Sequence, residues 1–478
     1  MYTGGPGGTG KSQIIKAIVA FHEAINARHH LKLASTIGTA AKLIGGSTIA
    51  SMFAFGYGKK SKKNNNSTKL ETAFKHTKTI VIDEVSTLSQ QQLANISQKL
   101  TLATKANPSE AFGRLDMLFF GDFLQFPPID GKALYSRWTE GPEINGRPTP
   151  NDQKKVWSWN MWRNLTHIYL LDEQMRVQDQ RYLNLLNRLR EGNCTDDDIA
   201  LLKTRVVERD ASITSLSGDP IITPGNELGM SINQLFAHEH SLSKTTYLTT
   251  AIYNNGNLPT DLVNLLKKRP NTQTQQIPGE LYMYVGMPVY LSKNMAVELG
   301  LTNGTSGIVK SIHLRNARNI TDDEGIHPVA FDKDEDYVVV ELHNISMMAP
   351  LPGLLQNQIP ITAKKGSFTY YPKGQKGKDG KPKKVNINIE HFPLVPKFSI
   401  TSHKSQGMTL NQAFVDLVPI KKNPVEINFA YVPLSRVRKL NDLHILRSFP
   451  DDVLKAKVNA SLAAMLEDFK RNDRCKDM

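Results

Sequence analysis

Short apolar runs alternate with helically spaced apolar residues through residues 1–165. The runs at Leu31–Ser35, Thr79–Ile82 and Leu115–Phe120 predict β-strands, because polar or turn-forming residues bound each of them. Helical spacing is seen in two sets of apolar residues: Ile14, Ile18, Phe21 and Ile25, and then Leu93, Ile96 and Leu100. Strands that alternate with helices predict an α/β fold built on a mostly parallel sheet.

A second α/β region is predicted from Ile168 onward. Its clearest helix stops at Gly192 and has an apolar face made of Tyr182, Leu185, Leu186 and Leu189. The pattern returns at Lys397–Thr401, and an amphipathic helix follows whose apolar residues are Leu454, Val458, Leu462, Met465 and Phe469. Arg137–Asn160 is rich in Pro, Gly, Trp and polar residues, so we expect a linker or surface excursion there.

Residues 280–345 have a different pattern. Met283–Ser292 and Gly307–Ile312 predict short antiparallel strands joined through Asn303-Gly304, a turn signal, and Tyr337–Leu342 predicts another strand. We therefore expect a small β-barrel that is inserted into the second α/β region and reaches Pro396.

Length and composition narrow the class of protein. A chain of 478 residues predicts two to four domains, and 40% hydrophobic with 22% charged residues is typical of a soluble globular protein. No long apolar run and no leader sequence are recognisable, so we expect no membrane association. Cys194 and Cys475 are the only cysteines, which excludes a disulfide framework and a cysteine-rich zinc site and favours an intracellular location.

The net charge of +14 favours a polyanionic partner such as nucleic acid or an acidic membrane surface. Half of that charge lies in Lys364–Lys384, which also contains Phe368, Tyr370 and Tyr371. Lysines with aromatic residues can follow phosphates and stack on bases, but a solvated mobile loop explains the composition equally well. Lys59–Lys63 is interpreted as a surface loop, with a localisation signal as the alternative.

The most specific chemical signal is the pattern G-x-x-x-x-G-K-[ST] near the first residue. It is formed by Gly5, Pro6, Gly7, Gly8, Thr9, Gly10, Lys11 and Ser12. Such a loop turns successive backbone N–H groups toward the phosphates of a nucleotide, and the helix that follows adds its dipole. Lys11 is expected to reach the β- and γ-phosphates, and Ser12 to bind Mg²⁺, which predicts ATP or GTP as the ligand.

Polar residues follow two other predicted strands. Asp83-Glu84 comes directly after one strand, and Gln125 lies just beyond another. Ligands of open α/β sheets bind outside the carboxyl ends of the strands, so these side chains are expected beside the phosphate loop. Asp83 is a candidate Mg²⁺ ligand, Glu84 a candidate base and Gln125 a candidate sensor of the γ-phosphate. Arg176 and Arg436 are candidates for transition-state stabilisation, although composition alone does not select them among the arginines.

The ordered set of motifs resembles the Pif (petite integration frequency) family of superfamily 1B DNA helicases, which are related to the RecD subunit. The matching stretches are Gly4 to Ser12, Gly38 to Ala41, Val81 to Ser86, Gly121 to Pro128, Glu173 to Arg176, Val285 to Val289, Asn303 to Thr305, Thr401 to Leu410 and Tyr431 to Arg436. Together they run from residue 4 to about residue 446.

This resemblance implies two RecA-like domains with ATP between them and a small SH3-like β-barrel inserted in the second. It places domain 1A at residues 1–165, with a wedge segment at about 51–78. It places domain 2A at residues 166–300 and 396–478, and domain 2B, with the lysine-rich loop, at residues 301–395. The implied activity is ATP-dependent 5′-to-3′ movement on single-stranded DNA with duplex unwinding, in repair, recombination or telomere maintenance.

The resemblance also implies roles for single residues. Glu84 would be the catalytic base, Gln125 the γ-phosphate sensor, and Arg176 and Arg436 the arginines that reach the γ-phosphate. Thr39, Thr48, His403, Lys404 and Gln406 lie in motifs that couple DNA to the nucleotide. Partners would be single-stranded DNA and duplex junctions, the protein would be a monomer, and the location would be the nucleus or mitochondrion of a eukaryote.

Three departures from the family pattern are expected to matter. The family's adenine-reading segment before the loop is not recognisable, the strand that feeds the loop is short, and Ala50 occupies a position where histidine is expected. An ATPase-impaired, nucleic-acid-binding remnant is therefore the main alternative. A phosphate-loop protein switch is a weaker one.

Overall fold

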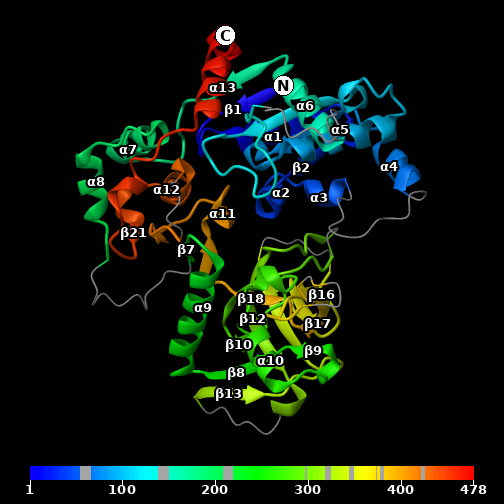
Figure 1. The fold of residues 1–478 in the computed structure, drawn as a ribbon, viewed down its shortest axis with the longest axis vertical. Coiled ribbons are helices and arrows are strands. Elements are labelled where there is room, and N and C mark those ends of the chain that lie inside the picture. The colour runs from blue at the N-terminus through cyan, green and yellow to red at the C-terminus, as the bar shows by residue number, and fades with distance from the viewer. Residues whose placement is uncertain are drawn as a thin grey trace. The chain divides into compact units, whose positions relative to one another are not determined.

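The structure is a computed structural model, and it describes residues 1–53, 66–137, 150–207, 219–296, 299–317, 324–343, 349–372, 374–376, 380, 382–420 and 426–477. The chain divides into two compact units (Figure 1). Unit 1 comprises Met1–Ile213 and Ser402–Met478, and unit 2 comprises Thr214–Thr401.

Unit 1 is built on a six-stranded parallel sheet. Its strands are β1 (Tyr2–Gly4), β2 (Leu31–Ser35), β3 (Ser47–Thr48), β4 (Thr79–Asp83), β5 (Asp116–Gly121) and β6 (Ile168–Leu170). The order is β3-β2-β4-β5-β1-β6, and each neighbouring pair is parallel. The three predicted strands and the parallel α/β fold are confirmed. The short first strand is also formed, because β1 pairs with β5 on one side and β6 on the other.

The structure describes the following helices in unit 1, and local capping signals mark the ends of several of them. The helices are α1 (Lys11–Ala24), α2 (Gly38–Leu43), α3 (Ile49–Met52), α4 (Asn66–Phe74), α5 (Gln90–Thr104), α6 (Pro150–Arg163), α7 (Gln180–Glu191), α8 (Asp196–Lys203), α11 (Ser402–Ser405), α12 (Ile427–Leu434) and α13 (Ala460–Arg471), and β20 (Ala413–Val415) pairs with β21 (Leu443–Ile445). Ser89 and Gln92 form a capping box at α5. Asp179 caps α7, which ends at Gly192 with a left-handed φ of 70°.

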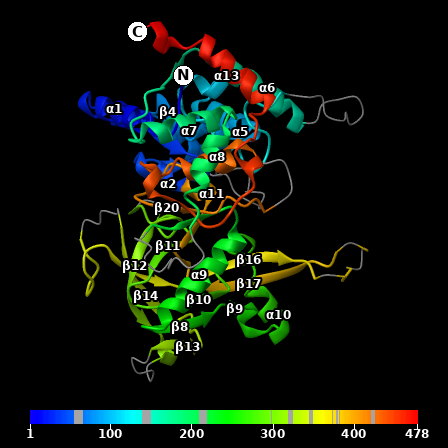
Figure 2. The same cartoon turned by 90° about the vertical axis from the view of Figure 1, so that its left-hand side faces the viewer.

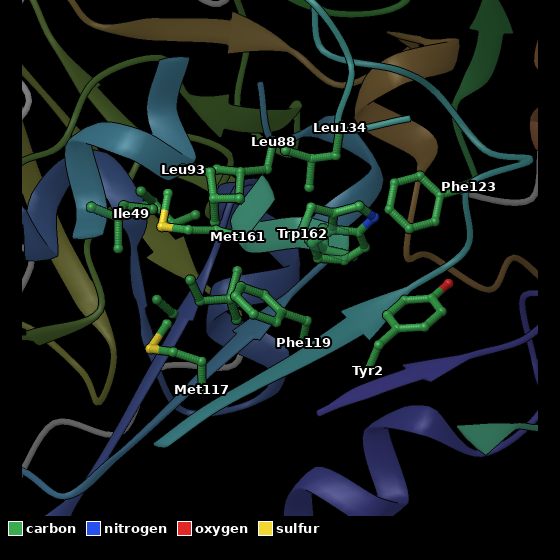
Figure 3. Packing of buried hydrophobic residues seen from close by; sticks show 14 of the residues in the cluster. Tyr2, Ile49, Leu88, Leu93, Met117, Phe119, Phe123, Leu134, Met161 and Trp162 are labelled. Atoms are coloured by element: carbon green, nitrogen blue, oxygen red, sulfur yellow. The ribbon is translucent and has the colours of Figure 1, made fainter. Parts of the chain in front are cut away.

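Alternate residues of each strand face opposite sides of the sheet. Ile80 and Ile82 of β4 pack in one core cluster, whereas Val81 packs in another with Ile15 of α1. The first cluster receives α5, α6 and α13, and Figure 3 shows Trp162 of α6 among Tyr2, Phe119 and Phe123. The sheet is therefore covered on both faces, as expected for a parallel sheet.

Two expectations for unit 1 need correction. Pro150–Arg163 is a helix rather than part of a linker, because Trp157, Met161 and Trp162 contribute to the core cluster beside α5. The first half of that predicted linker, residues 138–149, lies outside the described residues, as does Lys59–Lys63. In α1 the buried residue is Ile15, whereas Phe21 and Ile25, which the periodicity placed on the apolar face, are exposed.

Unit 2 is mainly antiparallel. Its elements are β7 (Ile221–Thr223), α9 (Asn226–Ser241), β8 (Thr245–Thr250), β9 (Ile252–Tyr253), α10 (Thr260–Leu266), β10 (Glu280–Met283), β11 (Pro288–Leu291), β12 (Ser306–His313), β13 (Gly325–Val329), β14 (Tyr337–Leu342), β15 (Gln358–Thr362), β16 (Lys364–Tyr370), β17 (Val385–His391), β18 (Leu394–Pro396) and β19 (Ser399–Thr401). Two antiparallel sheets have the orders β15-β14-β12-β11-β18 and β16-β17-β9. A mixed sheet has the order β10-β8-β13, in which β8 is antiparallel to β10 and parallel to β13. Met283–Ser292, predicted as one strand, contains the end of β10 and all of β11.

The lysine-rich segment belongs to a hairpin of β16 and β17, which extends far along its axis in Figure 2. One face of this hairpin is apolar: Phe368, Ile387 and Ile389 pack in a core cluster with Leu266 of α10. Phe368 is therefore not available to stack on a base. The guanidinium of Arg269 lies over the ring of Tyr370, 5.3 Å from its centroid, as in a cation–π contact.

Candidate functional site

The phosphate-loop motif joins β1 to α1 at the carboxyl end of the unit 1 sheet. Gly10 precedes α1 in a left-handed conformation with φ of 89°, which glycine adopts without strain. The ammonium group of Lys11 donates to the carbonyl oxygens of Gly5 at 2.7 Å and Pro6 at 2.8 Å, and the hydroxyl of Thr9 donates to Pro6 at 3.0 Å. The side chain of Lys11 thus folds back onto the glycine loop, and Ser12 follows it in the first turn of α1.

The predicted acid pair lies at the same end of the sheet. β4 ends at Asp83, whose carboxylate accepts the backbone N–H of Glu84 at 2.9 Å. Glu84 has a left-handed φ of 55°, and its carbonyl oxygen accepts the hydroxyl of Thr36 at 2.9 Å. Burial, together with the charge of Glu84, raises the pKa of Asp83 to about 7. Burial lowers the pKa of Lys11, whereas nearby carboxylates, above all that of Asp122, oppose this effect.

The predicted sensor and both predicted arginines converge on the glycine loop. A Cβ atom placed on Gly7 would lie 3.3 Å from Arg176 Nη1, 3.3 Å from Arg436 Nη2 and 3.4 Å from Gln125 Nε2. These residues come from three distant parts of the chain, yet all belong to unit 1. The structure therefore brings Lys11 and these three side chains into one site.

Among the residues that the structure describes, neither arginine forms an ion pair with an acid, and carbonyl oxygens accept hydrogen bonds from both. Arg436 is 1% exposed, and its guanidinium donates to the carbonyl oxygens of Val432 at 2.8 Å and Met408 at 3.2 Å. Arg176 donates to the carbonyl oxygen of Ser435 at 3.1 Å. Burial, followed by repulsion from Arg176, lowers the pKa of Arg436 to about 9. Two desolvated cations side by side favour an anionic ligand.

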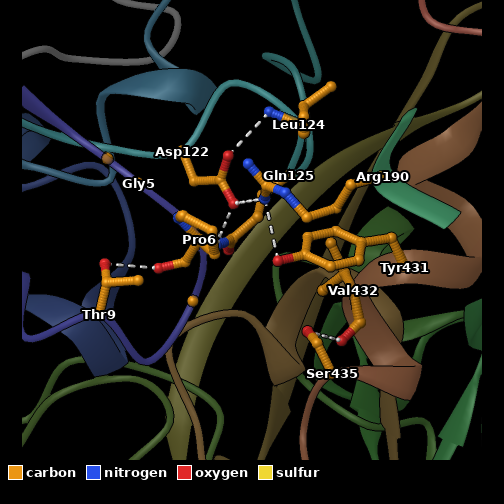
Figure 4. Close-up of polar contacts among 12 residues, drawn as sticks. Gly5, Pro6, Thr9, Asp122, Leu124, Gln125, Arg190, Tyr431, Val432 and Ser435 are labelled. Atoms are coloured by element: carbon orange, nitrogen blue, oxygen red, sulfur yellow. Dashed lines mark hydrogen bonds and ion pairs between the residues drawn. The ribbon is translucent and has the colours of Figure 1, made fainter. Parts of the chain in front are cut away.

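A buried network beside Gln125 was not anticipated from the sequence. Arg190 of α7 forms an ion pair with Asp122 and donates to the hydroxyl of Tyr431 at 2.9 Å. The same carboxylate oxygen of Asp122 accepts the amide of Gln125 at 3.3 Å, as Figure 4 shows. Although burial opposes it, Arg190 holds the pKa of Asp122 below its usual range. A signal was present, because Arg190 follows Leu186 by four positions and so lies on the apolar face of the helix.

A second unanticipated contact explains how Arg176 reaches the loop. Gln174 donates its amide to the carbonyl oxygen of Gly7 at 2.8 Å and accepts the N–H of Arg176 at 2.9 Å. A Cβ atom on Gly8 would lie only 2.2 Å from Gln174 Oε1. Gly8, with φ of 99°, therefore permits the close approach of this segment to the loop.

These features fit a nucleoside triphosphate with Mg²⁺. Gln125 Oε1 is buried and has no partner in the part of the chain that the structure describes, as expected for a group that awaits a ligand. The glycine loop, Lys11, the buried Arg436 and the half-buried Arg176 supply positive groups, and Ser12 with Asp83 supplies the oxygen ligands that Mg²⁺ prefers.

The five residues expected to couple DNA to the nucleotide differ in burial and in the groups that they contact. Thr48 caps α3 by accepting the N–H of Ser51 at 3.1 Å, and Thr39 has a buried hydroxyl for which the described residues offer no partner. His403 and Lys404 are exposed, and the ring of His403 stacks on Phe126 with centroids 3.9 Å apart. Gln406 is fully buried and donates to Glu84 Oε2 at 2.9 Å. A DNA role for these five residues stays a prediction.

Other classes of site receive no support in the described ranges. None of the helices described combines the length and apolar character needed to cross a membrane. Nor do the described His, Cys, Asp and Glu side chains form a group of three or more that suits a metal ion.

Comparison with known proteins agrees with this geometry. The profile of the PIF1-like helicase family matches residues 1–199. Over 98% of its length the chain is 27% identical to the ATP-dependent DNA helicase PIF1 of Xenopus laevis. The resemblance to the Pif family is confirmed. The chain spans between 52% and 64% of the length of three curated Pif-family relatives.

Solved structures agree on the fold. The crystal structure of the Pif1 helicase from Candida albicans superimposes with a TM-score of 0.64 at 21% identity, covering 98% of this chain and 95% of that one. The Bacteroides Pif1 bound to single-stranded DNA gives a TM-score of 0.63 at 20% identity, with 98% and 92% covered. The chain thus has the α/β fold of the Pif1 helicase structures.

Proposed function

We propose that this chain is a Pif-family, ATP-dependent DNA helicase that hydrolyses ATP at the glycine loop and moves 5′ to 3′ on single-stranded DNA. The observation that carries the proposal is the convergence of Gln125, Arg176 and Arg436 on Gly7. A loop with a purely structural role would not need one buried and one half-buried arginine, together with an amide, beside a glycine.

Each residue of the site has a part in this chemistry. Lys11, Arg176 and Arg436 stabilise negative charge that develops on the transferred phosphoryl group, and Glu84 accepts the proton of the attacking water. Gln125 donates one N–H of its amide to Asp122, and the same nitrogen lies beside Gly7, so its second N–H would sense the γ-phosphate. Mg²⁺, when bound by Ser12 and Asp83, would neutralise phosphate charge.

The finer architecture belongs to the same proposal. We assign a first RecA-like domain to residues 1–165, a second to residues 166–300 and 396–478, and an SH3-like insert to residues 301–395. The parallel strands β3-β2-β4-β5-β1, which all lie within residues 1–165, support the first domain. The antiparallel strands β12, β14 and β15, which lie within residues 301–395, support a small β-domain as the insert.

The substrate assignment has two supports. The net charge of +14 favours a nucleic acid, and the named relatives are DNA helicases, one of them crystallised with single-stranded DNA. We propose single-stranded DNA and duplex junctions as partners, and a monomer as the working unit.

The first experiment measures ATP hydrolysis with and without single-stranded DNA. We expect strong stimulation by DNA in the unmodified protein and loss of hydrolysis in Lys11→Ala. Lys16→Ala is the matched control, because Lys16 is an exposed lysine of the same helix. A folded protein that binds DNA but never hydrolyses ATP would instead be the binding-only remnant.

Direction is tested by strand displacement. Duplexes with a 5′ tail should be unwound in the presence of ATP, whereas duplexes with a 3′ tail should not. Unwinding from the 3′ tail alone would overturn the assignment to superfamily 1B.

A further inference from the structure

Gln406 lies in the nucleotide site, not at the surface. It follows the short helix α11, is 0% exposed, and donates its amide to Glu84 Oε2 at 2.9 Å. Its own oxygen, Oε1, is buried and has no partner among the described residues. A fully buried side chain whose donor binds the base is badly placed to contact DNA.

The next residue encloses the other side of the same carboxylate. Gly407 has φ of 78°, and a Cβ atom there would lie 3.4 Å from Glu84 Oε1. Gln406 thus fixes one oxygen of Glu84, while Gly407 leaves space beside the other. A general base needs one oxygen held in a defined direction and one lone pair left for the water.

The same segment also reaches the surface. Three positions before Gln406, the exposed ring of His403 stacks on Phe126 at an interplanar angle of 18°. Phe126 directly follows Gln125 in the chain. One short segment therefore contacts Glu84 at one end and the neighbour of Gln125 at the other.

We propose that Gln406 is a positioning residue for Glu84, and that it acts on the chemical step through this hydrogen bond. The proposal rests on the proposed function, since it assumes that Glu84 is the base. It assigns Gln406 to the nucleotide site rather than to DNA binding.

The test is a double-mutant cycle of Gln406→Met with Glu84→Gln, measured as DNA-stimulated ATP hydrolysis. Met keeps the length of Gln and removes the donor. We expect Gln406→Met to lower kcat by roughly 10- to 100-fold, a part of what a general base contributes. KM for ATP and Kd for single-stranded DNA should change by less than about twofold, because the proposal has Gln406 act through Glu84 alone.

In the Glu84→Gln background, the same change should have no further effect on the residual rate, because the two residues act as one unit. An equal loss in both backgrounds would overturn the proposal, as would weaker DNA binding with an unchanged kcat. If Gln406→Met does not fold, Gln406→Asn replaces it, since Asn is polar but too short to reach Glu84.

Failure of this inference is distinct from failure of the proposed function. An unmodified protein without ATP hydrolysis contradicts the function. An active protein that Glu84→Gln inactivates and Gln406→Met leaves intact contradicts only the role of Gln406.

Discussion

The glycine-loop site of unit 1 and the β16–β17 hairpin of unit 2 place their charged side chains in opposite environments. Unit 1 buries Asp83, Glu84, Asp122 and Arg436 around the glycine loop. The β16–β17 hairpin of unit 2 instead exposes its lysines: the side chain of Lys365 is 75% exposed, although its ammonium group lies 4.0 Å from the carboxylate of Glu390. A parallel sheet and an antiparallel hairpin thus place their charged side chains in different environments.

The two kinds of sheet explain this difference. In a parallel sheet the carboxyl ends of all strands meet, so the residues after β1, β4 and β5 gather in one place. In an antiparallel hairpin one face packs on the core and the other meets water. The polar residues after β1, β4 and β5 of unit 1 are therefore buried close together, whereas those of the β16–β17 hairpin of unit 2 lie along an exposed face.

The largest expected effect is the loss of Arg436 in unit 1. Arg436→Ala should lower kcat for ATP hydrolysis about 10³-fold or more, the range found for arginines that stabilise the phosphoryl transition state. The readout is steady-state hydrolysis at saturating DNA, with circular dichroism as a check of folding. Lys365→Ala in unit 2 is the control, and its basal hydrolysis should be unchanged. An equal loss of kcat in Arg436→Ala and Lys365→Ala would contradict the assignment of ATP hydrolysis to the site in unit 1.

Two ion pairs of unit 1, one buried and one exposed, show how much the environment of a charge matters for stability. Arg190→Met leaves Asp122 buried without its partner, which should reduce the free energy of unfolding by about 3–5 kcal/mol. The measurement is urea unfolding. Lys203→Met removes the exposed pair with Asp451 and should cost less than about 1 kcal/mol. Similar costs for the two variants would mean that the burial of the first pair is unimportant.

Unit 2 should be the more sensitive to moderate acid because of His391. Burial lowers the pKa of His391 to about 4, while its ring contacts Thr249 and the carbonyl oxygen of Pro278. In the unfolded chain this histidine protonates near its ordinary pKa of about 6.5, so the stabilisation is complete above that pH and is lost as pH falls toward 4. The loss should approach about 3 kcal/mol.

Thermal unfolding from pH 7.5 to 4.5 tests this expectation. His391→Gln should be less stable at pH 7.5 and should lose less stability on acidification than the unmodified protein. Parallel pH profiles of the two proteins would exclude His391 as the cause.

The smallest expected effect concerns the hairpin lysines of unit 2. Substituting Lys383 and Lys384 by Ala should weaken binding to single-stranded DNA. It should also reduce the slope of log K against log salt by roughly 0.7 for each phosphate that the lysines no longer neutralise. Fluorescence anisotropy at several salt concentrations measures this slope. Lys69→Ala with Lys105→Ala, in unit 1, provides a charge-matched control. An unchanged slope would mean that the hairpin does not contact DNA.

Local patterns were sufficient for much of unit 1. The strands Leu31–Ser35 and Thr79–Asp83 could be predicted because each is a short apolar run, and the glycine loop because its residues are contiguous. Placement of Asp83 beside the loop followed from the rule for parallel sheets.

Features that depend on distant partners could not be predicted. Arg190 pairs with Asp122, and the role of that pair depends on a contact between separate segments. The helix Pro150–Arg163 could not be predicted from its polar composition, because a distant contact, that of Trp162 with Phe469 of α13, supports it. The burial of Phe368 depends on contacts of β16 with residues such as Leu266 of α10, which the local run of lysines does not indicate.

The packing of β1 against α13 has a consequence for biosynthesis. The rings of Tyr2 in β1 and Phe469 in α13 pack together with centroids 5.0 Å apart, although the two residues are far apart in the sequence. During translation β1 leaves the ribosome long before its neighbour β6 and its covering helix exist. Such distant contacts slow folding, and a nascent chain would carry an incomplete nucleotide pocket, exposed to chaperones, until α13 has been synthesised.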